Sequence, residues 1–189
     1  MATVTRLPLS GDENADDFVS THPLALLIGL LLDQQVPTER AFAAPYQLSI
    51  RLDVDFDAAA IAWMPVKDLD ACFRKPPALH RYPGMMARRV QVLCSHIVEH
   101  HHGDAANIWS DCDDGAALLD RIRVLPGFSE HDARVLLALL GKRLGVRPHG
   151  WEVAAGPYGL PGYRSVADVV DRQSLDRVRA FRREQRSFG

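Results

Sequence analysis

Apolar residues recur at helical spacing along most of the chain, whereas the alternation typical of strands is scarce. Two Pro/Gly-rich stretches, 76–84 and 145–162, interrupt the pattern and are expected to be loops. The sequence therefore predicts an all-α fold. Helices are expected at about 14–20, 23–35, 38–50, 66–74, 84–102, 114–124, 130–144 and 166–186.

The length of 189 residues is sufficient for one compact unit with a sizeable core. No internal repeat or low-complexity linker divides the chain. No apolar run reaches 18 residues, and the polar opening segment is short of positive charge, unlike a signal peptide. We therefore expect a protein without a membrane segment, located in the cytoplasm.

Residues 118–140, LLDRIRVLPGFSEHDARVLLALL, place a Leu-Pro-Gly turn between two segments that each carry one apolar stripe. Pro126 stops the first helix, Gly127 permits a tight reversal, and Ser129 can cap the second helix. Such a turn leaves backbone N–H groups directed outward, which is a site for an anion such as a DNA phosphate. An ordinary helical hairpin without a ligand is the alternative. The residues expected to contact DNA here are Leu125, Pro126, Gly127, Phe128 and Ser129.

The surrounding segments place this turn in a wider pattern. Gln35 follows an apolar helix in the segment HPLALLIGLLLDQQVPTE. Ala87 lies at a helix start in the segment HRYPGMMARRVQVLCSHIVEHHHGD, which also contains a His/Gly turn. The Leu-Pro-Gly hairpin comes next. This order, over about residues 20–155, resembles the helix-hairpin-helix superfamily of base-excision DNA glycosylases, which includes endonuclease III and the adenine glycosylases. Four matching segments in one order are more specific than any one of them.

The resemblance implies two helical lobes around a cleft that receives an extruded base, because a stacked base shields its glycosidic bond. Within a single unit spanning 1–189, we expect segments of about 1–35 and 145–189 to form one lobe. The other lobe would comprise about 36–144, including the hairpin. The implied partner is double-stranded DNA with a damaged or mismatched base, bound by a monomer associated with the nucleoid.

The resemblance also implies roles for individual residues. Gln34 and Gln35 lie where the family inserts a side chain into the gap left by the flipped base, since an amide both donates and accepts hydrogen bonds. A solvated helix end is the alternative. His131 occupies the position of the lysine that forms a Schiff base in bifunctional members, so a lysine-dependent lyase reaction is not expected. His131 is instead a candidate pocket residue, or simply a histidine at a helix start.

The family's second signature is an aspartate after the hairpin, and the corresponding region, GVRPHGWEVAAG, contains none. Counting from His131 leads to His149, whereas alignment on Gly145 places Glu152 at the aspartate's position. Glu152 is therefore the candidate catalytic carboxylate, although a glutamate in the first turn of a short helix also has a purely structural explanation. Asp33 is the fallback, entering the cleft from the glutamine end.

Charge is distributed unevenly, although the net charge is −2. Residues 1–120 hold 9 Lys/Arg against 17 Asp/Glu, whereas residues 121–189 hold 13 against 7. The basic half is suited to neutralising phosphates, although a solvated helix face explains the last segment equally well. That segment contains Arg172, Arg177, Arg179, Arg182, Arg183 and Arg186.

No cofactor is expected. Endonuclease III-like proteins hold an iron–sulfur cluster with four cysteines near the C-terminus, and this chain has none after Cys112. His96 and His100 share a helical face but have no clearly spaced further ligand, so no metal site is expected. The family resemblance leaves room for a monovalent cation at the hairpin when DNA is bound. Trp151, beside Glu152, is a candidate pocket wall.

Together these features predict a monofunctional DNA N-glycosylase of base-excision repair, which hydrolyses the glycosidic bond of a damaged or mismatched base. One alternative is a catalytically inactive member of the same fold that binds lesions or unusual DNA structures. A further alternative is a helical interaction domain that retains the hairpin only as scaffold.

Overall fold

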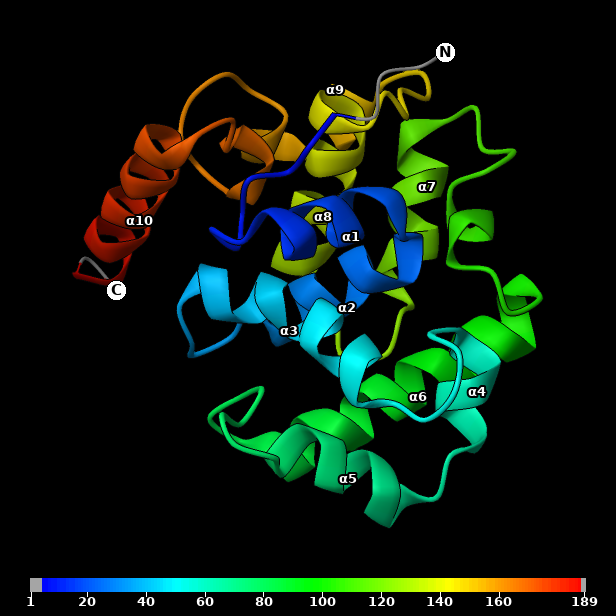
Figure 1. The fold of residues 1–189 in the computed structure, drawn as a ribbon. Helices are drawn as coiled ribbons and strands as arrows, with labels where there is room; N and C mark the ends of the chain where they lie inside the picture. The colour runs from blue at the N-terminus through cyan, green and yellow to red at the C-terminus, as the bar shows by residue number, and fades with distance from the viewer. Residues whose placement is uncertain (1–4, 188–189) are drawn as a thin grey trace.

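The computed structural model describes residues 5–187, and the regular elements within that range are all helical, as expected (Figure 1). The α-helices are α1 Glu13–Thr21, α2 Pro23–Leu32, α3 Thr38–Arg51, α4 Ala58–Trp63, α5 Val66–Arg74, α6 Pro83–His101, α7 Gly115–Arg123, α8 Glu130–Arg143, α9 Trp151–Ala154 and α10 Arg172–Ser187. Three short 3₁₀ helices complete the set: η1 Ala105–Ile108, η2 Gly156–Tyr158 and η3 Val166–Asp168.

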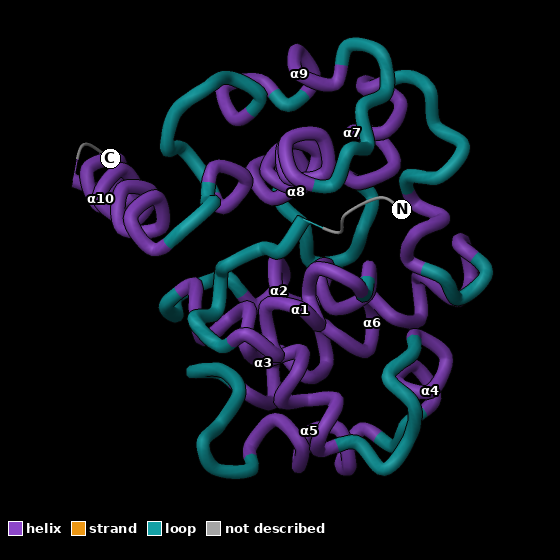
Figure 2. Tube along the Cα trace, turned by 45° about the horizontal axis from the view of Figure 1, so that its top comes forward, coloured by secondary structure: helices purple, strands orange, loops and turns teal. Residues whose placement is uncertain are grey.

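Helix α2 forms the centre of the core. Every residue from Leu24 to Leu32 is buried, as expected for a helix that is apolar on all sides. Helices α1 and α3 pack against it, and the approach of α3 is so close that a Cβ atom on Gly29 would lie 2.7 Å from Phe42 Cδ1. Helices α7, α8 and α9 gather at one end of the molecule and α5 lies at the other (Figure 2).

Most helices predicted from periodicity are present within a few residues. The structure adds α4 in a stretch given no helix, where Asp57 Oδ1 accepts a hydrogen bond from Ala60 N at 2.7 Å and caps the first turn. It also adds α9 and η2 inside the expected loop 145–162. The helix expected at 166–186 is split into η3 and α10, because Asp171 Oδ1 accepts from Ser174 N at 2.7 Å and starts a new helix there.

Packing crosses both of the lobe boundaries expected near residues 35 and 145. The N-terminal helices α1 and α2 pack on α3, and the hairpin helices α7 and α8 pack on α9 and η3 of the C-terminal segment. The lobe assignment therefore stays a prediction. Within residues 5–187, no helix alone has the length and apolar character to cross a membrane, and α1 with α2 meets that test only as a pair bent by 114°.

Candidate functional site

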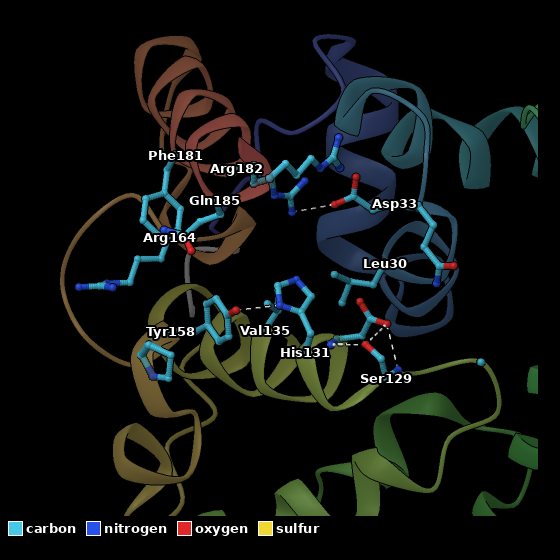
Figure 3. Close-up of a pocket in the computed structure, with 15 residues that line it drawn as sticks. Leu30, Asp33, Ser129, His131, Val135, Tyr158, Arg164, Phe181, Arg182 and Gln185 are labelled. Carbon is cyan, nitrogen blue, oxygen red and sulfur yellow. Dashed lines mark hydrogen bonds and ion pairs between the residues drawn. The ribbon is translucent and has the colours of Figure 1, made fainter. Parts of the chain in front are cut away.

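A cleft of about 730 Å³ lies between the end of α2, the start of α8, the loop after α9 and the C-terminal half of α10 (Figure 3). It brings together segments that are far apart in sequence. Its walls include the hairpin turn, two carboxylates, an imidazole, two aromatic rings and three arginine or glutamine side chains from α10. The lining residues are Leu30, Asp33, Gln34, Gly127, Ser129, His131, Asp132, Val135, Pro157, Tyr158, Arg164, Phe181, Arg182, Gln185 and Arg186.

The hairpin turn between α7 and α8 has the geometry that its sequence predicts. Ser129 Oγ accepts a hydrogen bond from Asp132 N at 3.1 Å, and Asp132 Oδ2 accepts from Ser129 N at 3.0 Å, which forms a capping box. Gly127 has φ +84° and packs so closely on α2 that an added Cβ would lie 2.6 Å from Leu31 Cδ1. Glycine is therefore required at this position both for its backbone conformation and for its lack of a side chain.

The turn also presents free backbone donors. Within residues 5–187, the N–H groups of Gly127, Glu130 and His131 have no hydrogen-bond acceptor, whereas Phe128 N donates to Leu125 O at 3.2 Å. Leu125 is buried, Pro126 and Phe128 are half-buried, and Gly127 and Ser129 are exposed. Unpaired N–H groups at the start of a 14-residue helix are suited to an anion, since the helix dipole adds positive potential there.

The two glutamines lie in the turn between α2 and α3 and differ in their surroundings. The Gln34 side chain lines the cleft, with Oε1 accepting from Arg89 Nη1 at 3.2 Å, and its carbonyl oxygen lies 2.8 Å from His80 Nε2. Gln35 is exposed and has φ +56°, a left-handed conformation that is uncommon for residues other than glycine. Gln34 is thus held in the cleft wall, whereas Gln35 projects from a strained loop.

Asp33 is the most buried carboxylate of the cleft, its side chain being 6% exposed. Its Oδ2 accepts from Arg182 Nη2 at 3.0 Å, and its Oδ1 accepts from Thr38 Oγ1 at 3.1 Å. Burial raises the pKa of Asp33, and the ion pair with Arg182 only partly opposes that effect. Figure 3 shows Arg182 reaching from α10 to this carboxylate across the cleft.

His131 faces the same cleft from the first turn of α8. Its Nδ1 lies 2.8 Å from the hydroxyl oxygen of Tyr158, and the two rings meet edge to face with centroids 5.1 Å apart. Partial desolvation by the cleft walls lowers the pKa of His131, although Asp132 acts in the opposite direction. The lowered pKa favours the neutral imidazole, and the Tyr158 hydroxyl can either donate to His131 Nδ1 or accept from it.

Glu152, the carboxylate favoured by the sequence, lies elsewhere. It is exposed on α9 and lines a separate hollow of about 480 Å³ together with Lys142 and Trp151. This hollow shares no lining residue with the cleft that contains His131. The Trp151 ring packs against α8, where a Cβ on Gly141 would lie 2.4 Å from it, so it is a packing residue. The structure thus brings together His131, Gln34 and the fallback carboxylate Asp33, but not Glu152.

Several cleft residues were not identified from the sequence. Tyr158, Arg164 and Phe181 carry no local motif and reach the cleft only through the fold. Arg182 lies in the arginine-rich segment, but its pairing with Asp33 spans 149 residues of sequence. The apolar residues Leu175 and Val178 of α10 are buried and show which side of the helix packs inward, but they do not reveal the contact of Arg182 with Asp33.

Other potential metal ligands lie outside the cleft. The rings of His96 and His100 lie with centroids 4.4 Å apart, and within residues 5–187 no set of three His, Cys, Asp or Glu side chains is arranged to hold a metal. Cys72, Cys94 and Cys112 are free thiols, and burial raises the pKa of Cys94 to about 12.

No family model matches this sequence, and no curated protein matches it either. Among solved structures, the chain is similar to one described as a non-covalent endonuclease III–DNA complex. The two share 17% identity with a TM-score of 0.47, over 86% of this chain and 73% of that one. At this level of similarity, an assignment of function has to come from the cleft itself.

Proposed function

We propose that this protein binds double-stranded DNA and hydrolyses the N-glycosidic bond of a damaged or mismatched base extruded into the cleft. The observation that carries the proposal is the convergence of three groups on one cavity: a buried carboxylate, a neutral imidazole and the unpaired N–H groups of the hairpin. A volume of about 730 Å³ is of the size that encloses small-molecule groups.

In this proposal the hairpin binds a phosphate through Gly127 and the first N–H groups of α8, and Gln34 or Gln35 faces the gap left by the base. Asp33 takes the role that the sequence suggested for Glu152. Its carboxylate stabilises the positive charge that develops on the sugar and accepts a proton from the attacking water. The electron pair of the breaking C–N bond leaves with the base, and the water oxygen becomes bonded to the sugar carbon. No bound cofactor takes part.

His131 contributes as a neutral hydrogen-bonding group on the cleft wall, oriented by Tyr158. The aromatic rings of Tyr158 and Phe181 offer apolar surface to a flipped base, which stacks favourably on such rings. Lysine-type covalent chemistry is not part of the proposal, because an imidazole occupies that position.

The decisive experiment compares Asp33→Asn with Glu152→Gln in single-turnover base release from a panel of lesion-containing duplexes. Both changes replace a carboxylate with its amide. We expect Asp33→Asn to lower the rate at least about 100-fold while the affinity for a duplex with an abasic-site analogue is retained, as for the loss of a catalytic electrostatic group. Glu152→Gln should act like the wild type. If only Glu152→Gln shows a large loss of rate, Glu152 rather than Asp33 is the catalytic carboxylate. If the wild-type protein releases no base, the enzymatic proposal is refuted.

One observation favours the second candidate, a lesion-binding protein without catalysis. Arg182 already neutralises Asp33 in the free protein, and a carboxylate bound to a guanidinium is a weaker base. Such a protein would bind the abasic-site analogue more tightly than undamaged DNA, release no base, and be insensitive to Asp33→Asn at unchanged stability.

A further inference from the structure

We infer that the C-terminal half of α10 is a second binding surface for the DNA backbone, placed across the cleft from the hairpin. This inference rests on the proposed function, because it takes duplex DNA as the ligand. The surface, here called the arginine face, consists of Arg179, Arg182, Arg183 and Arg186. Together with Asp176 and with Val36, Pro37 and Thr38 of the loop and helix start opposite, these arginines line a hollow of about 410 Å³.

The arginine face adjoins the cleft directly. Arg182 and Arg186 line both the hollow and the cleft, so the two lie side by side at α10. The hairpin N–H groups are on the α8 side of the cleft, and α10 is on the other (Figure 3). A strand whose base enters the cleft would therefore meet phosphate-binding groups on both sides of the extruded nucleotide.

Burial indicates that this half of the helix is not built for packing. Ser174, Leu175 and Val178 are the buried residues of α10, and none of the described residues after Val178 is buried. What holds the C-terminal half to α2 and α3 is mainly electrostatic: Arg182 pairs with Asp33, and Arg179 pairs with Glu39. The C-terminal half of α10 therefore leaves its arginine side open to a ligand.

The charges on the arginine face are only partly compensated. Positions 179, 182, 183 and 186 fall on one side of a helix, where like charges repel one another. Asp33 neutralises Arg182, and Glu39 and Asp176 both pair with Arg179, whereas Arg183 and Arg186 have no carboxylate partner within residues 5–187. A polyanion that passes over the hollow would relieve this repulsion, and arginine is suited to phosphate because its planar donors match the oxygen geometry.

The test compares two double variants that remove the same charge from α10. Arg183→Gln/Arg186→Gln changes the two unpaired members of the arginine face, both exposed, so the fold should be retained. The matched control is Arg172→Gln/Arg177→Gln, whose residues line neither the cleft nor the hollow. Affinity for an undamaged 25-bp duplex, labelled with a fluorophore, is measured at several salt concentrations.

For Arg183→Gln/Arg186→Gln we expect the slope of log K against log salt to fall by about 1.8, because each phosphate contact contributes about 0.9. The control should keep the wild-type slope within about 0.5. If the slope falls equally in both double variants, the effect is one of general charge and the inference is overturned. The inference is also overturned if the slope changes in neither double variant.

Base release separates this inference from the proposed function. If the wild-type protein releases no base and the salt slopes still differ as expected, the arginine face stands and the enzymatic proposal fails. If base release depends on Asp33 and the slopes are the same, the enzymatic proposal stands and the arginine face fails.

Discussion

Arg182 Nη2 on α10 lies 3.0 Å from Asp33 Oδ2 at the end of α2, although the two residues are 149 positions apart. The same guanidinium donates from Nη1 to Thr38 Oγ1 at 3.0 Å, and Thr38 in turn donates to Asp33. The carboxylate is thus fixed by two partners that also bind each other. This arrangement connects the protonation of Asp33 to the position of α10.

The first prediction concerns the pH dependence of base release in Arg182→Met. Burial raises the pKa of Asp33 and Arg182 lowers it, so loss of the guanidinium lets the pKa rise further. Because the ionised carboxylate is the active form in the proposed reaction, activity is lost as pH falls through this pKa. We therefore expect the acid limb of the single-turnover rate to move to higher pH.

The control for this shift is Arg183→Met, the neighbouring residue, which is exposed and has no contact with Asp33 within residues 5–187. Its acid limb should coincide with that of the wild type at saturating protein. If the acid limb of the rate profile of Arg182→Met stays in place or moves to lower pH, Asp33 is not the group that titrates.

Tyr158→Phe tests the orientation of His131. The change removes the hydroxyl that lies 2.8 Å from His131 Nδ1 but keeps the ring that packs on the imidazole. We expect base release to slow by about 5-fold, the cost of a neutral hydrogen bond of about 1 kcal/mol, with DNA affinity unchanged. Tyr163→Phe, outside the cleft lining, is the matched control. Equal rates for Tyr158→Phe and wild type would show that the contact with Tyr158 does not matter for base release.

Gly127→Ala tests the contact between the hairpin and α2. Alanine at φ +84° is strained, and its methyl group would lie 2.6 Å from Leu31 Cδ1. We expect a loss of about 1–3 kcal/mol in the free energy of unfolding, measured by urea denaturation, together with weaker duplex binding. Gly145→Ala has a similar φ of +72° but open space around it, so it should show the backbone cost alone. A smaller loss for Gly127→Ala than for Gly145→Ala would contradict the packing argument.

Lys142→Met tests what holds the loop that carries Tyr158 and Arg164. Lys142 Nζ lies 2.6 Å from Asp168 Oδ1, and the Asp168 side chain is only 5% exposed. Removal of the lysine leaves a buried carboxylate without its cation, which costs about 3–5 kcal/mol. Thermal unfolding should therefore start at a markedly lower temperature. Lys67→Met is the control, because Lys67 is exposed and forms no ion pair within residues 5–187. Similar melting curves for both variants would show that the pair contributes little.

The fold was largely predictable because its signals are local. The apolar run of α2, the stop at Pro126 and the cap at Ser129 act within one or two helical turns, and each appears where the sequence places it. The short helices were missed for the same reason: α4 and α9 have 6 and 4 residues, too few for a periodic pattern.

The cleft was predictable only in part. His131 and Gln34 lie in it, because the turns that carry them have sequence signals of their own. Spacing along the sequence could not show which carboxylate shares the cleft with His131. Glu152 and Asp33 both lie near helix ends, and only tertiary packing brings Asp33 to the cleft. The choice of Glu152 relied on counting from Gly145 along the loop into the first turn of α9, and that helix directs Glu152 to a different hollow from the one that contains His131.

The contact between Gly127 and Leu31 has a mechanical consequence. Leu31 precedes Asp33 by two residues, and the hairpin touches it without room for a methyl group. The hairpin turn and the Asp33 carboxylate are therefore linked through Leu31. If a phosphate binds at the turn as proposed, this link fixes the distance between the sugar and Asp33. In the proposed complex, the distance from the turn to Asp33 would thus determine which nucleotide reaches the cleft, whatever base that nucleotide carries.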